Sequence, residues 1–350
     1  MSKTFKIKLT PVDNYFLGSD RTFHYGEEDR NRAGRSEYFI KSEILPLQTS
    51  LFGVIRYLGI KDKQADYGLT EEDKANIGNY SFAYDNESQN FGKIKSISPL
   101  YIEQEVDGKN RLLIKTPRDH KIGDVDSYHP FEEYVEVFTS LGKRYLMTDF
   151  DAKKGIDQGF ITIDDHKLVD INEIFSMDEK TGIRIEQKEK AYYKMGYRRM
   201  EKSSFVFYAT VEDYFPEISD KIVYMGARKS AFTVCVTREE EPKVEIDGTK
   251  IPGMKKVYFL SDSYVKEEDM QIINDKAVSM NLSTRTARGY MTNYGKQTQR
   301  NRFKKTDCLY RLIEAGSIII IPQESETEVK KVIENEHMQI VGCNRIVVGG

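Results

Sequence analysis

The sequence predicts an α+β protein with antiparallel sheets, on the basis of three observations. Strand-like runs outnumber helical ones along the 350 residues. Two or three helical patterns recur between pairs of strands, which favours α+β over a parallel doubly wound sheet. The length exceeds that of a typical single domain, so two sheet-and-helix domains are expected.

The first third of the chain alternates between strand and helix signals. Residues 4–12, TFKIKLTPV, alternate at period two and predict a strand, and the polar, glycine-rich residues 13–40 predict a long loop. Apolar residues at helical spacing predict a helix over about 49–60, followed by a charged connection. A strand KSISPLYIEQEV, a turn at Asp107-Gly108 and a strand RLLIKT come next.

The rest of the chain is read in the same way. Residues 118–170 have no regular pattern, and in 182–211 two strand-like runs flank a basic, tyrosine-rich turn. A glycine turn then leads into a strand in YMGARKSAFTVCVT, and VYFLSDS predicts another strand. The strand GSIIII and an acidic helix over about 325–336 precede the tail.

The composition is that of a folded chain, with 39% hydrophobic and 31% charged residues. No apolar run approaches the 18 residues of a membrane span, and the opening residues lack the apolar core of a secretory signal, so a cytoplasmic protein without membrane contact is expected. Three widely separated cysteines predict no disulfide framework. No cofactor is expected.

The net charge of −3 hides an uneven distribution. Residues 276–306 contain no Asp or Glu, whereas the same segment carries eight cations: Lys276, Arg285, Arg288, Lys296, Arg300, Arg302, Lys304 and Lys305. A basic segment in an otherwise acidic chain is typical of a polyanion-binding site. The alternative is a solvated loop.

The start of the helix at 49–60 is a candidate phosphate site. Gln48, Thr49 and Ser50 stand where amide groups are free and the helix dipole is positive. Thr49, Gly53 and Arg56 form one stripe, where the glycine would let a backbone approach closely. The alternative is that Thr49 caps the helix and Arg56 pairs with a surface acid.

A second candidate is the turn Gly226-Ala227-Arg228-Lys229-Ser230, because small-residue turns can present amides and cations to an anion. The spacing of a nucleotide-hydrolysing P-loop is absent, and a plain hairpin turn is the alternative.

Aromatic residues interleave with the basic segment at Tyr290, Tyr294 and Phe303. Single-stranded RNA binding uses this combination, because phosphates contact the cations and bases stack on the rings. Tyr192, Tyr193, Tyr197, Arg198 and Arg199 offer the same mixture over a shorter range. Exposed strand faces would explain both patterns equally well.

Catalytic patterns are few. The five histidines form no metal-binding or triad spacing. Only His24, in RTFHYGE, has neighbours suited to acid–base work on RNA, and a solvent-facing histidine is the alternative.

Taken in order, several blocks resemble the RAMP superfamily of CRISPR-associated proteins, and within it the third subunit of the Cmr (type III-B) interference complex. They are TFKIKLTPVDNYFLGSDRTF, LPLQTSLFGVIR, TGIRIEQKEKAYYKMGYRRM before an F-x-F strand, YMGARKSAFTV, and GSIIII with GCNRI. The resemblance implies two ferredoxin-like (RRM-like) domains with long insertions, over residues 1–180 and 181–350.

The resemblance also implies a non-catalytic subunit that binds the 5′ repeat-derived handle of CRISPR RNA. Its partners would be the large polymerase-like or cyclase-like subunit and the backbone subunit, with target RNA sensed indirectly. The binding residues expected from the blocks are Lys41, Ser42, Gln48, Thr49, Ser50, Arg56, Arg228, Lys229 and Ser230. Chemistry alone adds Arg285, Arg288, Arg300 and Arg302.

Two rival functions are left open by the sequence. One is a RAMP endoribonuclease that processes CRISPR RNA without a metal, with His24 as acid or base. The other is a scaffold that contacts only protein partners.

Overall fold

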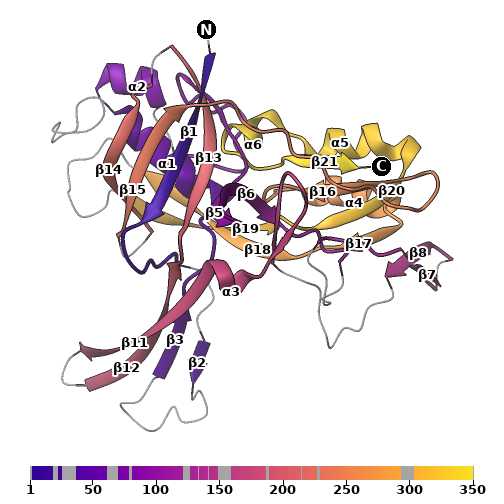
Figure 1. Ribbon diagram of the computed structural model, residues 1–350, viewed down its shortest axis with the longest axis horizontal. Helices are drawn as coiled ribbons and strands as arrows, with labels where there is room; N and C mark the ends of the chain where they lie inside the picture. Colours follow the sequence, from indigo (N-terminus) through magenta and orange to yellow (C-terminus); the bar gives the residue numbers. More distant parts are fainter. Residues whose placement is uncertain are drawn as a thin grey trace.

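The computed structural model has an α+β architecture with mostly antiparallel sheets and few helices, as predicted (Figure 1). It describes residues 2–18, 23–25, 37–60, 70–78, 81–120, 127–132, 134–140, 142–148, 159–186, 189–213, 215–226, 229–292 and 303–349. Within these residues no helix is both long and apolar enough to cross a membrane.

The largest sheet has nine strands, all from the first 240 residues. Its order is β10 (Leu168–Val169), β9 (Phe160–Thr162), β6 (Lys109–Lys115), β5 (Tyr101–Val106), β13 (Ser203–Glu212), β1 (Ser2–Pro11), β15 (Ser230–Arg238) and β14 (Ile218–Met225). The ninth strand, β4 (Ile94–Ile97), pairs with β13 beside this path.

Helix α1 (Gln48–Gly59) covers one face of this sheet. In β1 the alternate residues Phe5, Ile7 and Leu9 are buried, as the period-two pattern predicts. They pack in one cluster with Leu51 and Ile55 of α1, which lie on the stripe predicted for the helix. A short helix, α2 (Glu71–Ile77), lies beside α1.

A second sheet projects from the body of the molecule (Figure 1). Its long strands β11 (Phe175–Glu186) and β12 (Glu189–Met200) form an antiparallel hairpin. The strand β3 (Glu37–Lys41) pairs in parallel with β12, and β2 (Phe23–Tyr25) pairs with β3. A short helix, α3 (Ile171–Ile174), leads into the hairpin.

The last third of the chain builds a third sheet and most of the remaining helices. The sheet order is β17 (Ser279–Asn281), β20 (Ile318–Pro322), β16 (Met254–Phe259) and β21 (Ile346–Gly349). Helices α4 (Glu267–Lys276) and α5 (Glu326–Ile333) contribute Ile273, Val329 and Ile333 to the core on one face. The 3-10 helix η1 (Gln323–Ser325) precedes α5, and α6 (Glu336–Ile340) precedes β21.

Two two-stranded ribbons complete the fold. One joins β7 (Tyr134–Phe138) to β8 (Arg144–Thr148), and the other joins β18 (Thr284–Thr292) to β19 (Phe303–Ile313). The first and third sheets meet through a separate apolar cluster that includes Tyr101, Tyr208 and Tyr258. The first and third sheets therefore share a buried interface.

Several local predictions are wrong in detail. The predicted loop at 13–40 contains β2 and β3, and the predicted tyrosine-rich turn inside 182–211 is part of β12. The stretch at 95–106 is two strands, interrupted at Ser98-Pro99-Leu100, and the irregular region 118–170 contains β7 to β10. The strands β3, β12 and β4 pair with strands that are distant in sequence, so local pattern carried little information there, whereas β7 pairs with the neighbouring β8.

The predicted boundary at 180/181 falls inside β11, and β13 to β15, which follow it, lie in the sheet of β1. The division into two ferredoxin-like domains remains a prediction.

Candidate nucleic-acid interface

Two of the blocks singled out from the sequence meet at the segment Tyr15–Leu17, directly after β1. The Ser230 hydroxyl oxygen accepts a hydrogen bond from the Phe16 amide at 2.9 Å. The Ser42 hydroxyl oxygen accepts one from the neighbouring Leu17 amide at 2.8 Å. The structure thus brings residues 41–42 and 229–230 to two consecutive peptide groups. Both serines are buried, so their hydroxyls are engaged inside the protein.

The glycine turn fits closely against the same segment. Gly226 has φ of +78°, and a Cβ there would lie 2.5 Å from the Phe16 carbonyl oxygen, so only glycine suits the position. The Lys229 amide donates to the Gly226 carbonyl at 3.1 Å, and Lys229 itself is exposed with φ of +52°. Arg228 lies outside the described residues.

The base of the β11–β12 hairpin packs against Lys41 and Ser42. The Ser42 amide donates to the Gly196 carbonyl at 2.8 Å, and a Cβ on Gly196 would lie 3.6 Å from Lys41 Cγ. The rings of Tyr197 and Phe16 are 5.5 Å apart, centroid to centroid.

Lys180 Nζ lies 4.9 Å from the centroid of the same Tyr197 ring. We call the exposed lysines Lys41, Lys180 and Lys229, together with Tyr197, the junction. Lys180 and Tyr197 lie on one face of the second sheet, whereas Lys41, paired with Gly196, lies on the other face. The junction combines cations with an aromatic ring at the root of a projecting hairpin, which is the chemistry of single-stranded nucleic-acid binding.

The head of α1 lacks the cap that one of the two sequence interpretations expected. The N-cap residue is Leu47 and makes no side-chain cap bond, so the alternative that Thr49 caps the helix is wrong. Thr49 hydrogen-bonds with the hydroxyl of Tyr84, whose pKa burial raises well above its ordinary value. Ser50 is half-buried, and its amide donates to the Leu47 carbonyl at 2.8 Å.

The closing block of the chain covers part of this helix head. Gly342 has φ of +77°, and a Cβ there would lie 2.4 Å from the Ser98 carbonyl oxygen and 3.0 Å from Gln48 Oε1. Gln48 is 5% exposed, and its Oε1 has no hydrogen-bond partner in the structure as described. The first turn of α1 is thus closely packed, and the buried oxygen Gln48 Oε1 accepts no hydrogen bond from the described residues.

Arg56 holds the end of α2. Its Nε donates to the Ile77 carbonyl at 3.0 Å and its Nη2 to the Gly78 carbonyl at 3.1 Å, and the guanidinium lies 5.9 Å from the centroid of Phe91. These two bonds are to carbonyls, whereas the alternative interpretation expected an acidic partner. Arg56 therefore has a structural task apart from any contact with RNA.

The basic segment proves to be the β18–β19 ribbon, and its arginines differ in environment. Arg285 contacts Asp262 at 3.2 Å and the Leu45 carbonyl at 3.4 Å. Burial alone would lower the pKa of Arg285, but Asp262 and other carboxylates outweigh it, so the pKa is raised and the ion pair is retained. Arg300 and Arg302 lie outside the described residues.

On the opposite face of the ribbon the cations are accessible. Arg288 is half-buried, and Arg311, which faces Thr286 across the ribbon, is exposed. The sequence reasoning missed Arg311 because it follows the acid-free segment. Arg311 pairs with Thr286, two residues before Arg288, so both arginines lie on the same face of the ribbon. Strand alternation could therefore have identified Arg311.

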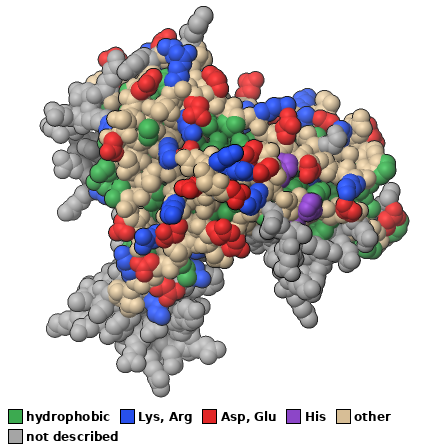
Figure 2. Space-filling view, viewed as in Figure 1, with side chains coloured by type: hydrophobic (Ala, Val, Ile, Leu, Met, Phe, Trp, Pro, Cys, Tyr) green, Lys and Arg blue, Asp and Glu red, His purple; other side chains and the backbone are tan. Residues whose placement is uncertain are grey.

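The surface charge pattern and the catalytic candidates give little further information about the site. On the face shown in Figure 2, Lys and Arg side chains are interspersed with Asp and Glu, without a large field of one sign. Among the described residues, no group of three or more His, Cys, Asp or Glu could hold a metal ion. The backbone of His24 lies in β2, opposite Tyr38, and its side chain is outside the described part.

Residues 7–287 match the family model described as CRISPR-associated protein (Cas_Cmr3). A solved structure, the cryo-EM structure of the type III-B Cmr-beta bound to cognate target RNA, contains a chain with 14% identity and a TM-score of 0.46, over 99% of this chain and 96% of that one. The crystal structure of the Csm3-Csm4 subcomplex in the type III-A CRISPR-Cas interference complex contains a chain with 13% identity and a TM-score of 0.36. That match covers 91% of this chain and 94% of the other.

No curated protein matches the sequence. The assignment therefore depends on the sequence match to the family model, which spans most of the chain from β1 to β18. On that match, the protein belongs to the CRISPR-associated Cas_Cmr3 family.

Proposed function

We propose that this type III CRISPR subunit is a non-catalytic protein that binds the 5′ repeat-derived handle of CRISPR RNA. In the same proposal it bridges the large polymerase-like subunit to the backbone subunit and senses target RNA indirectly. The family membership supports the setting, and the junction supports RNA as the ligand.

The single observation that carries the proposal is the convergence at Phe16 and Leu17. Hydrogen bonds from these two amides fix Ser42 and Ser230, and so fix the lysine that precedes each serine. The two exposed lysines then lie at the root of the hairpin that presents Tyr197. Cations positioned by rigid elements contact phosphates, and the Tyr197 ring, beside Lys180, offers a stacking surface for one base.

The helix head and the ribbon are secondary contacts in this proposal. The first turn of α1, where the dipole is positive, would attract a phosphate, whereas the buried Gln48 acceptor would not contact one. Arg288 and Arg311 extend the cationic surface onto the ribbon. Arg285 contributes by holding the loop before α1 through Leu45, so its role in RNA binding is indirect.

The test uses the protein assembled with its sister subunits and guide RNA. Lys41→Glu and Lys229→Glu are each expected to lower handle affinity by about tenfold and to flatten its salt dependence, because each removes a phosphate contact and introduces repulsion. Lys331→Glu, on the exposed face of α5, is the matched control. Unchanged affinity in both junction variants would contradict the proposal.

Two further measurements separate the rivals. Cleavage of repeat RNA in EDTA that disappears in His24→Ala would favour the endoribonuclease, which needs no metal. Ultraviolet crosslinking that gives no RNA adducts within 41–56, 226–230 or 285–302 would favour the scaffold.

A further inference from the structure

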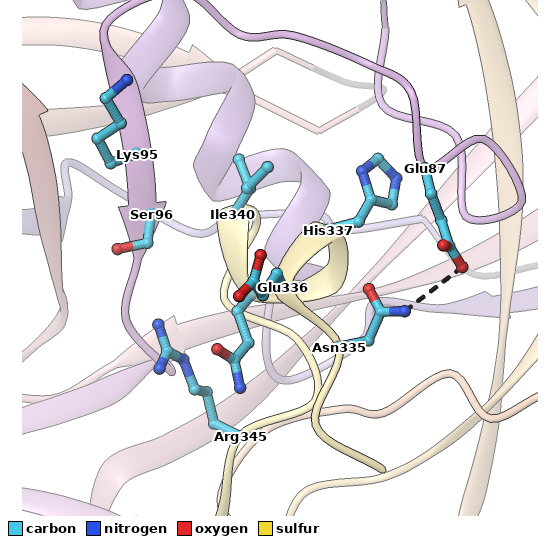
Figure 3. A pocket seen from close by; sticks show the side chains of 9 residues that line it. Glu87, Lys95, Ser96, Asn335, Glu336, His337, Ile340 and Arg345 are labelled. Atoms are coloured by element: carbon cyan, nitrogen blue, oxygen red, sulfur yellow. Dashed lines mark hydrogen bonds between the residues drawn. The ribbon is translucent and has the colours of Figure 1, made fainter. Parts of the chain in front are cut away.

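A pocket of about 600 Å³ opens between β4 and α6, and none of the residues assigned to RNA lines it (Figure 3). Lys95 and Ser96 come from β4, and the cap and helix of α6 contribute Asn335, Glu336, His337, Gln339 and Ile340. Arg345 and Glu87 complete the lining. The volume lies within the ordinary range of protein ligand sites.

One wall of the pocket is the strand β4, which lies between β13 and α6. β4 pairs only with β13 among the described strands, and its other side contacts α6. Ser96 faces Thr210 and Ile94 faces Val211, so Lys95 is a bulge residue without a partner in register. A groove between a strand edge and a helix is a recurring place for an extended peptide to bind.

Several polar groups of the lining are unused. Arg345 Nε is buried without a hydrogen-bond partner among the described residues, and so is Nδ1 of His337, a residue only 6% exposed. His337 is fixed by its other nitrogen, Nε2, which lies 2.9 Å from the Ala83 carbonyl oxygen, and by its ring, stacked 4.7 Å from that of Phe82. Buried groups of this kind are costly unless a ligand or water satisfies them.

The charges of the pocket are divided between two sides. Lys95, Ser96 and Arg345 lie on one side in Figure 3, Glu87, Asn335 and His337 lie on the other, and Glu336 lies between them. Lys95 pairs with Glu212 at 3.1 Å, and Glu87 pairs with Lys266 at 3.1 Å, both on the surface. A ligand that suits both sides needs an anionic group at one end and hydrogen-bond donors at the other.

A polypeptide meets these requirements better than RNA. Two cations and two carboxylates line the pocket, so it has no net attraction for a polyanion. Apart from His337, whose ring already stacks on Phe82, the lining has no aromatic side chain on which a base could stack. An extended segment would instead offer main-chain groups to the edge of β4 and a carboxylate to Arg345 and Lys95.

We infer that this pocket is a docking site for a short extended segment of a partner protein, with an acidic side chain seated between Lys95 and Arg345. That the partner is a sister subunit of the complex rests on the proposed function. The docking chemistry itself rests only on the pocket.

The decisive probe is a photocrosslinking amino acid, p-benzoylphenylalanine, at Gln339 in the complex assembled from co-expressed sister subunits. A protein adduct that maps to an acidic segment of one subunit is expected. An adduct with RNA, or no adduct, would overturn the inference.

Charge reversal supplies the second measurement and its control. Lys95→Glu should weaken incorporation of the subunit into the complex by about tenfold or more, because it opposes the docked carboxylate. Lys93→Glu is matched to it, since Lys93 precedes the same strand and pairs with Asp213 at 3.3 Å outside the pocket. Equal effects of the two substitutions would refute the docking site.

The two proposals fail separately. Loss of the Gln339 adduct with normal handle binding would remove only the docking site. Normal handle binding by both junction variants, Lys41→Glu and Lys229→Glu, together with a protein adduct at Gln339, would remove only the RNA assignment.

Discussion

Replacing Lys256 by methionine should destabilise the protein more than loss of any exposed ion pair. Lys256, on β16, is 0% exposed, and Asp119 is 1% exposed. The ammonium lies 3.1 Å from Asp119 Oδ2 and 2.6 Å from the Tyr128 hydroxyl, which in turn donates to Asp119 Oδ1 at 2.6 Å. This network joins the loops after β6 to the third sheet.

The expected loss follows from what the substitution leaves behind. Methionine has a similar length, so little cavity forms, but the Asp119 carboxylate keeps only the Tyr128 bond among the contacts described for it. Burial lowers the pKa of Lys256, and Asp119 acts against that shift, so the ammonium and the carboxylate support each other. Removing one member of a buried pair costs about 3–5 kcal/mol, a large part of a typical unfolding free energy of about 5–15 kcal/mol.

Urea unfolding followed by far-ultraviolet circular dichroism measures the loss. Lys250→Met is the matched control, because its pair with Glu132 is exposed on both sides and should contribute at most about 1 kcal/mol. Adding Asp119→Asn to Lys256→Met should recover part of the loss, since no buried charge remains. A loss below about 1 kcal/mol, or one equal to that of Lys250→Met, would refute the reasoning.

Three further outcomes are expected. Gly342→Ala should lower the melting temperature, with a loss of about 1–3 kcal/mol, because φ is +77° and the new Cβ would meet the Ser98 carbonyl; an unchanged melting temperature would contradict this. Gly53→Ala should instead raise stability by up to about 1 kcal/mol, because nothing lies within 4 Å of its Cβ, and weaker handle binding by this variant would indicate close approach of RNA. Stability should fall as pH rises above 10, because burial raises the pKa of tyrosines such as Tyr134, to about 12. These tyrosines stay protonated in the folded state and ionise in the unfolded state, which favours unfolding. Urea midpoints that rise above pH 10 would contradict this prediction.

Local signals in the sequence were sufficient for the parts of the fold that depend on neighbours along the chain. The alternation of β1, the stripe of α1 and the turn at Asp107-Gly108, where both residues have positive φ, are all present. Each of these follows from side-chain periodicity or from the backbone freedom of a turn residue. Prediction and structure therefore agree there to within a few residues.

Distant pairing explains what the sequence did not reveal. Residues 192–199 are basic and rich in tyrosine, and they form a strand because β11 and β3 lie on either side of them. Lys256 gives no sign in MKKVYF that it is fully buried while Lys255 beside it is not. Its burial depends on Asp119 and Tyr128, which reach it from the loops after β6.

At the site, the sequence identified two Lys-Ser pairs, but not which residue of each pair is structural and which is exposed to a ligand. In Lys41-Ser42 and Lys229-Ser230 the serine is buried and bonded to a main-chain amide, and the lysine is exposed. Ser230→Ala should therefore lower stability by about 1–3 kcal/mol, because the Phe16 amide loses its acceptor. Lys229→Ala should leave the melting temperature unchanged and weaken handle binding. If the serine variant weakened binding without loss of stability, its hydroxyl would contact the RNA, and the structural role assigned to it would be wrong.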